Sequence, residues 1–298
     1  EILATGEVYR LARRAFSFDE DDVREVTVSG TQVGPRKFRA YRLRGARTRE
    51  ERATEAKAMA GQVGLFGRSI EIRAIASTFG EVLANQKSAY LCVLGELGVG
   101  KSALVAAALD ELDPKPRFLR TECVFGSSEM PYEAVAELVR EACGIRDDDS
   151  SEDARKRLAR TARRVLPAPL RAATLESLEP LIAPTLAAQE DPGDRSAGLT
   201  RAIRHLLGGL AQEGPLVVWV DALQFADTPS IQLVSRLMTQ SYDAQLLVIL
   251  SSRGDDRIDS QLGQVARIDL DELDEEERRA LVGARFGGAK VTPEIQQA

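Results

Sequence analysis

The sequence predicts an α/β fold in which a parallel sheet is sandwiched between helices, and two observations support this prediction. From residue 63 onward, apolar segments of strand length alternate with segments of helical periodicity, as in sheets whose parallel strands are joined by crossover helices. The segment "PLVVWVDA" at residues 215–222 is apolar almost throughout, as expected of a central strand buried on both faces. We therefore expect this fold to occupy residues 63–298.

Each element of this domain is predicted from its own pattern. Apolar runs bounded by turn residues predict strands, and apolar residues that recur every three or four positions predict helices. Residues 147–195 are rich in arginine, alanine and proline, which predicts helical segments with breaks. The predicted strands are 88–95, 116–123, 215–222 and 244–253, and the predicted helices are 71–84, a helix that begins near Lys101, 132–144, 196–214, 230–242 and 274–288.

Residues 1–45 predict a separate small α+β piece made of a helix and a hairpin. Residues 2–16 carry apolar side chains at mixed three- and four-residue spacings, which predicts a helix, and the acidic "DEDD" that follows predicts a turn. The segments "VREVTVSG" (23–30) and "KFRAYRLRG" (37–45) alternate as half-buried strands do, and "TQVGPR" between them predicts the hairpin connection. This piece is too small to bury a core of its own.

A change in composition separates this piece from the α/β domain. Residues 46–62, "ARTREERATEAKAMAGQ", are charged, alanine-rich and poor in large apolar side chains, which predicts a solvated helical linker. We therefore expect three parts, at 1–45, 46–62 and 63–298. The chain starts at Glu1 without a methionine, and we expect it to be a piece of a longer protein.

The composition narrows the possible functions. The chain has 298 residues and a net charge of −6, so we expect neither nucleic acid nor a membrane surface as a partner. Its three cysteines and one histidine have no metal-ligand spacing, which argues against zinc and favours a reducing cytoplasm. No apolar run approaches the roughly 20 residues needed to span a bilayer. We expect a cytoplasmic protein.

The segment "GELGVGKS" at residues 95–102 matches the phosphate-binding loop pattern G-x-x-x-x-G-K-[ST]. Glycines allow the backbone to curl so that its N–H groups face the phosphates, and the helix that follows directs its positive end at the same anion. The lysine reaches the β- and γ-phosphates, and the serine hydroxyl ligates Mg²⁺. We expect ATP or ADP with Mg²⁺ to bind at Gly95, Gly98, Val99, Gly100, Lys101 and Ser102.

A phosphate-binding loop needs an acid at the end of a neighbouring buried strand, where it holds the Mg²⁺ with its water shell. Asp221 ends the apolar segment "LVVWVD" and is the candidate. The alternative is that Asp221 caps a following helix, which aspartate also does well. The predicted metal ligands are Ser102 and Asp221, and the predicted fold is a P-loop NTPase.

Four segments in order resemble one family: "GLFGRSIEIRAI", the phosphate-binding loop, "VVWVDALQFAD" and "LLVILSSR". They resemble the AAA-type ATPase domain of large bacterial signalling proteins, the signal-transduction ATPases, over roughly residues 63–285. The resemblance implies that Gly67 and Arg68 lie beside the adenine or ribose and that Asp227 serves a structural turn. It also implies that Arg253 senses phosphate and acts with Lys101 and Asp221 in catalysis. A surface arginine at the end of a strand is the alternative for Arg253.

Two departures from the family pattern affect hydrolysis. The family carries a second acid directly after the metal-binding aspartate, and such an acid polarises the attacking water. Here that position is Ala222, and Glu96 within the loop is a conceivable substitute. The small helical lid of the family should follow residue 285, where only "GGAKVTPEIQQA" remains of it. We therefore expect ATP binding with slow or absent hydrolysis, and an active ATPase that uses a substitute carboxylate is the alternative.

Residues 1–45 resemble the last helix and final hairpin of a class III nucleotide cyclase domain. This resemblance implies that the cyclase catalytic residues precede Glu1, so we expect no cyclase activity from the chain. The leading hypothesis is an ATP-dependent regulatory switch, with a cyclase domain before it and helical-repeat or sensor domains after it as partners. The alternatives are an accessory domain of an enzyme defined by cyclase activity and, with less support, a DNA-loading ATPase.

Overall fold

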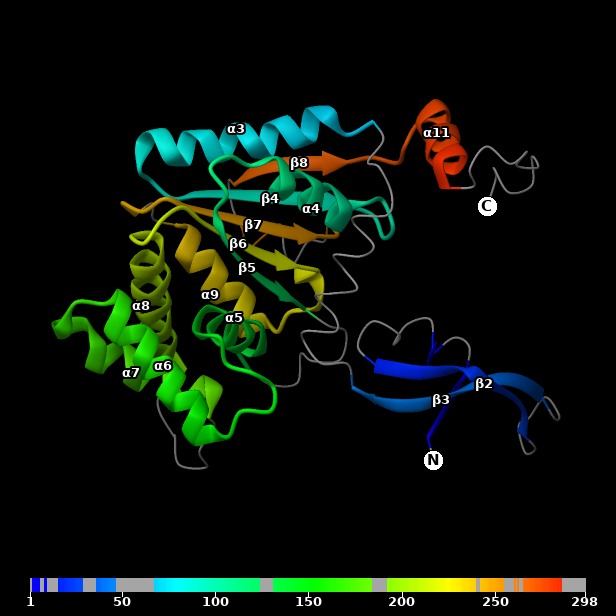
Figure 1. The fold of residues 1–298 in the computed structure, drawn as a ribbon, viewed down its shortest axis with the longest axis horizontal. Helices are drawn as coiled ribbons and strands as arrows, with labels where there is room; N and C mark the ends of the chain where they lie inside the picture. Colours follow the sequence, from blue (N-terminus) through cyan, green and yellow to red (C-terminus); the bar gives the residue numbers. More distant parts are fainter. Residues whose placement is uncertain are drawn as a thin grey trace. The chain divides into compact units, whose positions relative to one another are not determined.

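The computed structural model divides the chain into two compact units, Glu1–Gln62 and Val63–Ala298, and each is described by itself (Figure 1). The structure describes residues 2–5, 8–9, 16–28, 36–46, 67–123, 131–183, 192–239, 242–254, 260, 262 and 265–285.

The second unit is an α/β domain with a five-stranded sheet. The strand order is β5-β6-β7-β4-β8, and each neighbouring pair is parallel. The strand β6 lies between β5 and β7, and all six of its residues are buried, which confirms the prediction of a central strand. The strands are β4 (Ala89–Gly95), β5 (Arg117–Glu122), β6 (Leu216–Asp221), β7 (Leu246–Ser252) and β8 (Ala266–Leu270).

Helices cover both faces of this sheet (Figure 1), as predicted. On one face, α3 and α4 pack against each other and bury Phe79 and Leu104 over Val93 and Ile249 of the sheet. On the other face lie α5, α8 and α9, and the pair α6 and α7 packs outside them against α8. The helices are α3 (Ser69–Asn85), α4 (Lys101–Glu111), α5 (Glu133–Cys143), α6 (Ser151–Val165), α7 (Ala168–Ile182), α8 (Pro192–Ala211), α9 (Thr228–Met238) and α11 (Glu275–Arg285), with a 3₁₀ turn η2 at Leu223–Phe225.

The sequence did not predict the strand β8, which pairs in parallel with β4. Only its last residue, Leu270, is buried, and the side chains from Ala266 to Asp269 are exposed or half-buried. Such an edge strand carries no continuous apolar run, so the pattern that identifies buried strands is absent. None of the described helices is both long and apolar enough to span a membrane.

The first unit contains a three-stranded antiparallel sheet in the order β1-β3-β2. Its long hairpin, β2 (Phe16–Val28) with β3 (Arg36–Ala46), confirms the predicted hairpin. These strands do not join the five-stranded sheet. The hairpin connection at 29–35, the linker after Ala46 and the chain after Arg285 lie outside the described residues.

Two predictions for the first unit were wrong. Residues Leu3–Thr5, expected in a helix, form β1, because they pair with β3 and Ala4 is buried there; Val8 and Tyr9 are helical. The acidic "DEDD", expected as a turn, lies within β2, where the pairing with β3 is irregular between Asp19 and Val23. A bulge lets a strand absorb extra residues without ending. Long-range pairing thus overrides the local pattern in both segments.

Candidate nucleotide-binding site

The loop between β4 and α4 has the backbone that a phosphate cradle requires. Gly98 and Gly100 have φ of 86° and 101°, a left-handed region that side chains other than glycine rarely adopt. A Cβ atom on Gly95 would lie 2.7 Å from the carbonyl oxygen of Leu270, so this close approach of β4 to β8 requires glycine. Gly100 is the N-cap of α4, and the free N–H groups of that helix end suit an anion.

The Lys101 ammonium lies over this loop. Its Nζ donates to the carbonyl oxygens of Gly95 at 2.7 Å and Glu96 at 2.8 Å. Burial lowers the pKa of Lys101, and the nearby charge of Arg253 acts in the same direction, while Asp221 opposes both. Neutral carbonyl groups are weaker acceptors for a cation than charged oxygens are. A phosphate in the loop would therefore be a better partner for Lys101 than the carbonyl groups it now contacts.

Ser102 and Asp221 meet at the carboxyl edge of the sheet, as the predicted metal site requires. Ser102 Oγ donates to the Asp221 carboxylate, 3.0 Å from Oδ2 and 3.2 Å from Oδ1. The residue Asp221 is only 4% exposed. Hydroxyl and carboxylate oxygens are the donors that Mg²⁺ prefers, so this pair fits Mg²⁺ bound together with nucleotide phosphates.

Three further groups hold the Asp221 carboxylate in place. Arg120 donates from a guanidinium nitrogen at 2.8 Å, and the backbone N–H of Ala222 donates at 3.0 Å. Ser251 Oγ also donates to Asp221, and it accepts a hydrogen bond from Trp219 Nε1 at 3.0 Å. Arg120 in turn stacks over the Trp219 ring, 4.3 Å from its centroid. Because most of these donors are side chains, they can move away when a cation binds.

The sequence alone did not identify Arg120 or Ser251 as parts of the site. Arg120 lies in β5 opposite Trp219, and Ser251 lies near the end of β7. A polar residue near the carboxyl end of each strand was visible in the sequence. The sequence did not predict the strand order, in which β5 and β7 flank β6 and bring both residues next to it.

Arg253 comes to the same edge of the sheet. It follows β7, its backbone N–H donates to Gln224 Oε1 at 3.1 Å, and its guanidinium lies 5.8 Å from the centroid of the Phe225 ring. Its charge contributes to the lowered pKa of Lys101, so the two cations lie near each other. Two such cations would both favour a polyphosphate. That Arg253 senses the terminal phosphate stays a prediction.

Gly67 and Arg68 lie at the start of α3. The Arg68 guanidinium donates to Glu71 Oε1 at 3.2 Å and to the carbonyl oxygen of Asp271. Gly67 has a φ of 72°, and a Cβ atom there would collide with the side chain of Glu277 in α11. These contacts connect α3 with the segment that follows β8. The expected contact of both residues with adenine or ribose stays a prediction.

Asp227 caps a helix. Its carboxylate accepts from the backbone N–H and hydroxyl of Ser230 at 2.8 Å and 2.6 Å, at the start of α9. It also accepts from the backbone N–H groups of Tyr132 and Glu133, at 2.8 Å and 3.1 Å. One buried carboxylate therefore joins the beginnings of α9 and α5, which is a structural role.

The position after Asp221 has no group that could act on water. Ala222 has a φ of 56° and a ψ of 43° and starts the turn η2. This left-handed conformation is one that aspartate and asparagine tolerate better than most residues. The conceivable substitute Glu96 is exposed on the phosphate-binding loop, next to Leu97, which is 74% exposed.

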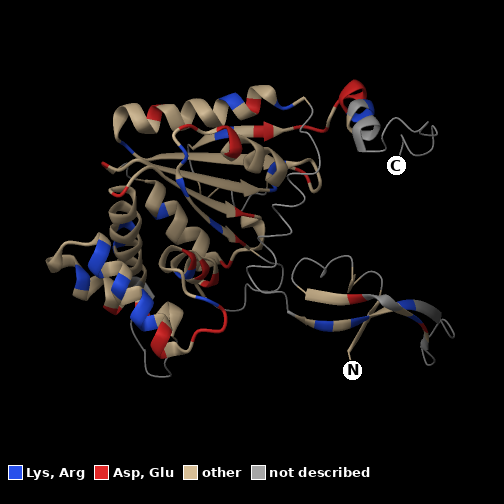
Figure 2. Cartoon of the chain, viewed as in Figure 1, with Lys and Arg blue, Asp and Glu red and all other residues tan. Residues whose placement is uncertain are grey.

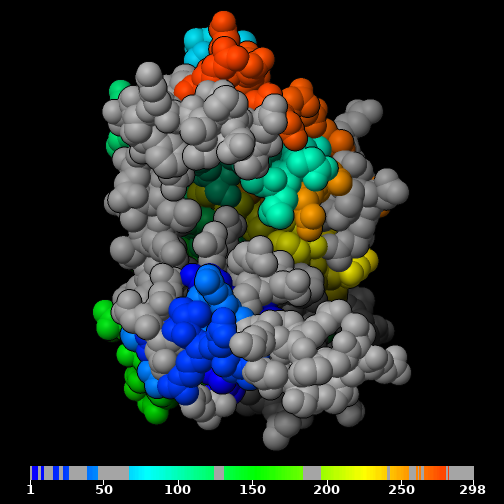
Figure 3. All heavy atoms as spheres, turned by 90° about the vertical axis from the view of Figure 1, so that its right-hand side faces the viewer, coloured from blue at the N-terminus to red at the C-terminus, as the bar shows by residue number. Residues whose placement is uncertain are grey.

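These groups gather where α/β sheets bind ligands, outside the carboxyl ends of the strands. Figure 3 faces this edge and shows the loop and the start of α4 (teal) beside the ends of β6 (yellow) and of β7 and β8 (amber to orange). The edge therefore presents the loop and the strand ends that carry the predicted metal ligands on one surface.

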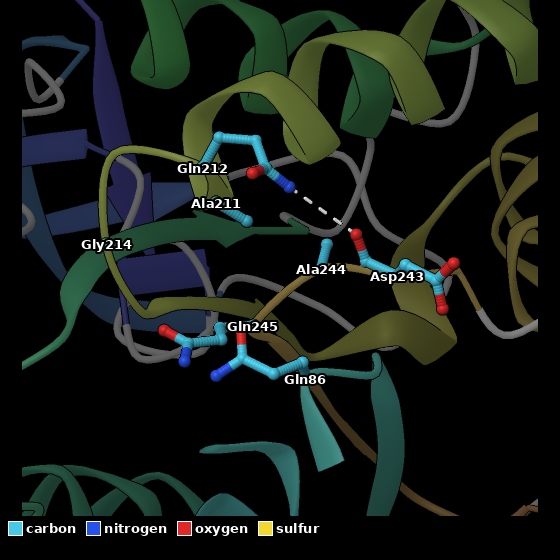
Figure 4. Close-up of a pocket in the computed structure, with 7 residues that line it drawn as sticks. All are labelled: Gln86, Ala211, Gln212, Gly214, Asp243, Ala244 and Gln245. Carbon is cyan, nitrogen blue, oxygen red and sulfur yellow. Dashed lines mark hydrogen bonds between the residues drawn. The ribbon is translucent and has the colours of Figure 1, made fainter. Parts of the chain in front are cut away.

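A pocket of about 320 Å³ lies at the opposite edge of the same domain (Figure 4). Two of the residues that line it lie just before strands, Gly214 two positions before β6 and Gln245 directly before β7, so the pocket lies at the amino ends of the strands. The Gln212 side chain spans it and donates to the Asp243 carbonyl oxygen at 3.5 Å. A nucleotide held by the phosphate-binding loop would lie at the other edge.

Comparison with known proteins gives a family and several distant structures. The model of the AAA ATPase domain family matches residues 64–249, and no curated protein matches. The Aeropyrum pernix ORC1 protein, solved in complex with DNA, is 14% identical with a TM-score of 0.45; the match covers 78% of this chain and 53% of that one. The Drosophila ORC bound to DNA is 17% identical with a TM-score of 0.47, and the match covers 82% of this chain and 54% of that one.

A signal-transduction ATPase with numerous domains from Pyrococcus horikoshii, which carries a tetratricopeptide repeat sensor, is 16% identical with a TM-score of 0.36, over 79% of this chain and 27% of that one. This chain thus spans about half the length of the first structures it matches. The family match covers more than half of the chain and includes the phosphate-binding loop, Asp221 and most of β7. The chain therefore belongs to the AAA ATPase domain family.

Proposed function

We propose that the chain is an ATP-binding regulatory module, a nucleotide-dependent switch in a multidomain signalling protein. The observation that carries this proposal is the hydrogen bond of Ser102 to Asp221. It lies next to a phosphate-binding loop whose Gly95 carbonyl oxygen accepts a hydrogen bond from Lys101. Together these groups supply a phosphate cradle, a cation for the β- and γ-phosphates and two oxygen ligands for Mg²⁺. Mg²⁺ would neutralise phosphate charge when bound, and Ser102 and Asp221 would hold it.

We propose further that hydrolysis is slow. Lys101, Ser102 and Asp221 suffice to hold the nucleotide, but attack on the γ-phosphate also needs an oriented water. General acid–base assistance contributes typically about 10²- to 10⁴-fold to a rate, and the methyl group of Ala222 cannot provide it. A module that holds ATP for a long time suits a switch. The two states of such a switch differ in the nucleotide that is bound and do not depend on rapid ATP turnover.

The link to a cyclase is a finer proposal and rests on the resemblance of residues 1–45. The antiparallel hairpin of the first unit is compatible with the final hairpin of a class III adenylate or guanylate cyclase domain. In this proposal a cyclase domain precedes the switch and sensor or helical-repeat domains follow it. ATP binding would bias the neighbouring domains by favouring one of two states of the module.

The binding proposal is tested by the substitution Lys101→Ala. Removal of the cation that faces the phosphates should weaken ATP binding in the presence of Mg²⁺ by about 2 to 4 kcal/mol, which is roughly 30- to 1,000-fold in Kd. Calorimetric titration measures this directly. Lys87→Ala is the matched control, because Lys87 is exposed and precedes the other end of β4, and it should bind as the parent does. Equal ATP affinity of parent and Lys101→Ala would refute the proposal.

A further inference from the structure

We propose that Glu122 is the carboxylate that aligns the attacking water and accepts its proton in the slow hydrolysis of ATP by this chain. The proposal rests on the proposed function. It names the carboxylate that replaces the water-polarising acid for which Ala222 has no side-chain group. Glu122 is the last residue of β5. Sequence reasoning considered only Glu96, because that residue lies within the recognisable loop.

The sheet register places Glu122 beside the metal-binding aspartate. In the parallel pair β5 and β6, Glu122 is the aligned partner of Asp221, and Arg120 is the aligned partner of Trp219. Aligned residues on neighbouring strands project from the same face of a sheet. Cys123 continues the pairing, with its N–H donating to the Asp221 carbonyl oxygen at 2.9 Å. Glu122 therefore lies on the face of the sheet that carries Asp221 toward Ser102.

A shared arginine confirms that the two carboxylates face the same space. The same guanidinium nitrogen of Arg120 lies 2.8 Å from Asp221 Oδ2 and 3.6 Å from Glu122 Oε2. Figure 2 shows acidic residues (red) at the carboxyl ends of β5 and β6. The Glu122 side chain is 23% exposed, whereas that of Asp221 is 5% exposed. Glu122 is thus the carboxylate of the pair that water can reach.

The position of Glu122 also suits the direction of attack better than that of Glu96. The phosphate-binding loop holds the leaving side of the nucleotide, and an in-line displacement requires the water to approach from the opposite side. Glu96 belongs to the loop itself. Glu122 belongs to a different strand, three positions away in the sheet order from β4, which leads into the loop, and it is held there by the strand and by Arg120.

The chemical step is a hydrolysis whose atoms balance. The water oxygen forms a bond to the γ-phosphorus, and the bond from that phosphorus to the β,γ-bridging oxygen breaks. The bridging oxygen leaves with the electron pair as part of ADP, and the water proton passes to the Glu122 carboxylate. Arg120, which contacts both carboxylates, is a positioning residue for this pair.

The test compares Glu122→Gln with Glu137→Gln on the whole chain. Glu137 is a matched control, because its side chain is 22% exposed and lies 3.6 Å from Arg140, as Glu122 does from Arg120. Phosphate release under single-turnover conditions should fall at least about tenfold in Glu122→Gln and stay unchanged in Glu137→Gln. Calorimetry should show equal ATP affinity in both variants and in the parent.

A second readout does not depend on turnover. ADP with aluminium fluoride imitates the transferring phosphoryl group, and Glu122→Gln should weaken its Mg²⁺-dependent binding at least about tenfold, while ADP alone binds equally. Unchanged phosphate release and unchanged aluminium fluoride binding in Glu122→Gln, or a loss in Glu96→Gln instead, would overturn the proposal. A parent that binds ATP but releases no phosphate would overturn it as well. A parent that binds no ATP would refute the proposed function itself.

Discussion

Two buried aspartates, six residues apart, end β6 and begin α9, and they are held in different ways. Asp221 and Asp227 are each 4% exposed, and each carboxylate accepts several hydrogen bonds. Asp227 accepts from three backbone N–H groups and one hydroxyl. Asp221 accepts from Ser102, Ser251 and Arg120 side chains and from one backbone N–H group.

The difference shows how a buried carboxylate can serve structure or ligand binding. Backbone donors are fixed by the helices to which they belong, so Asp227 cannot change partners without disturbing α5 and α9. Side-chain donors can rotate away, so the Asp221 carboxylate can change partners without disturbing a helix. A buried charge is costly unless it is paired, and Arg120 pairs with Asp221 at 2.8 Å.

The largest effect is expected from Asp227→Ala. This substitution removes the cap of α9 and leaves the backbone N–H groups of Tyr132 and Glu133 without their acceptor. We expect the free energy of unfolding to fall by about 3 kcal/mol or more, as measured by urea denaturation. Ser150→Ala, which removes only the exposed cap of α6, should cost about 1 kcal/mol. An equal cost for the two variants would contradict the structural role of Asp227.

A smaller effect, on rate rather than stability, is expected from Ala222→Asp. The substitution restores an acid after Asp221 at a left-handed position that aspartate tolerates. Phosphate release should rise by about tenfold or more, and Ala222→Glu tests the same idea with a longer side chain. Stability and ATP affinity should change little. Brisk turnover in the parent, or no gain in either variant, would show that position 222 does not limit the rate.

The smallest effect concerns a third buried aspartate, Asp19 in β2. Arg42 and Arg44 lie 2.6 Å and 3.0 Å from its carboxylate, and these hydrogen bonds, that of Arg42 above all, lower the pKa of Asp19. A lowered pKa stabilises the fold above the unfolded-state value of about 3.9, and that contribution is lost as the pH falls through the folded-state value.

The first unit should therefore lose stability in acid, and Asp19→Asn should remove part of that pH dependence. Because both arginines are well exposed, solvent screening keeps the effect small. The amide NMR signals of β2 and β3, followed in the whole chain below about pH 4, report it. Identical acid profiles of parent and Asp19→Asn would show that the two ion pairs do not contribute.

The parts of the site that sequence predicted are those encoded locally. Gly95, Lys101 and Ser102 belong to one loop, and Asp221 directly follows an apolar run, so a short window contains the signal. Arg120, Glu122 and Ser251 lie in strands whose neighbours depend on the strand order, which no local pattern specifies. Their place beside Asp221 appears only when β5 and β7 flank β6.

The same distinction holds for the fold. Strands buried on both faces, such as β6, were predicted from composition, and β8 was missed because only Leu270 is buried in it. Residues 3–5 were misassigned because three residues are too few to show alternation, and their pairing with β3 decides their conformation. Elements that depend on long-range pairing were therefore the ones that the sequence did not predict.

The most direct test of the role of Asp221 is a calorimetric titration of parent, Asp221→Asn and Asp227→Asn with ATP, each with and without Mg²⁺. Asparagine retains an acceptor at both positions and caps a helix well. Asp221→Asn should lose about tenfold or more of the affinity that Mg²⁺ adds, because an oxygen ligand loses its charge. Asp227→Asn should retain the whole Mg²⁺ effect. An unchanged Mg²⁺ effect in Asp221→Asn, or an equal loss in both variants, would contradict the assignment of Asp221 as the metal ligand.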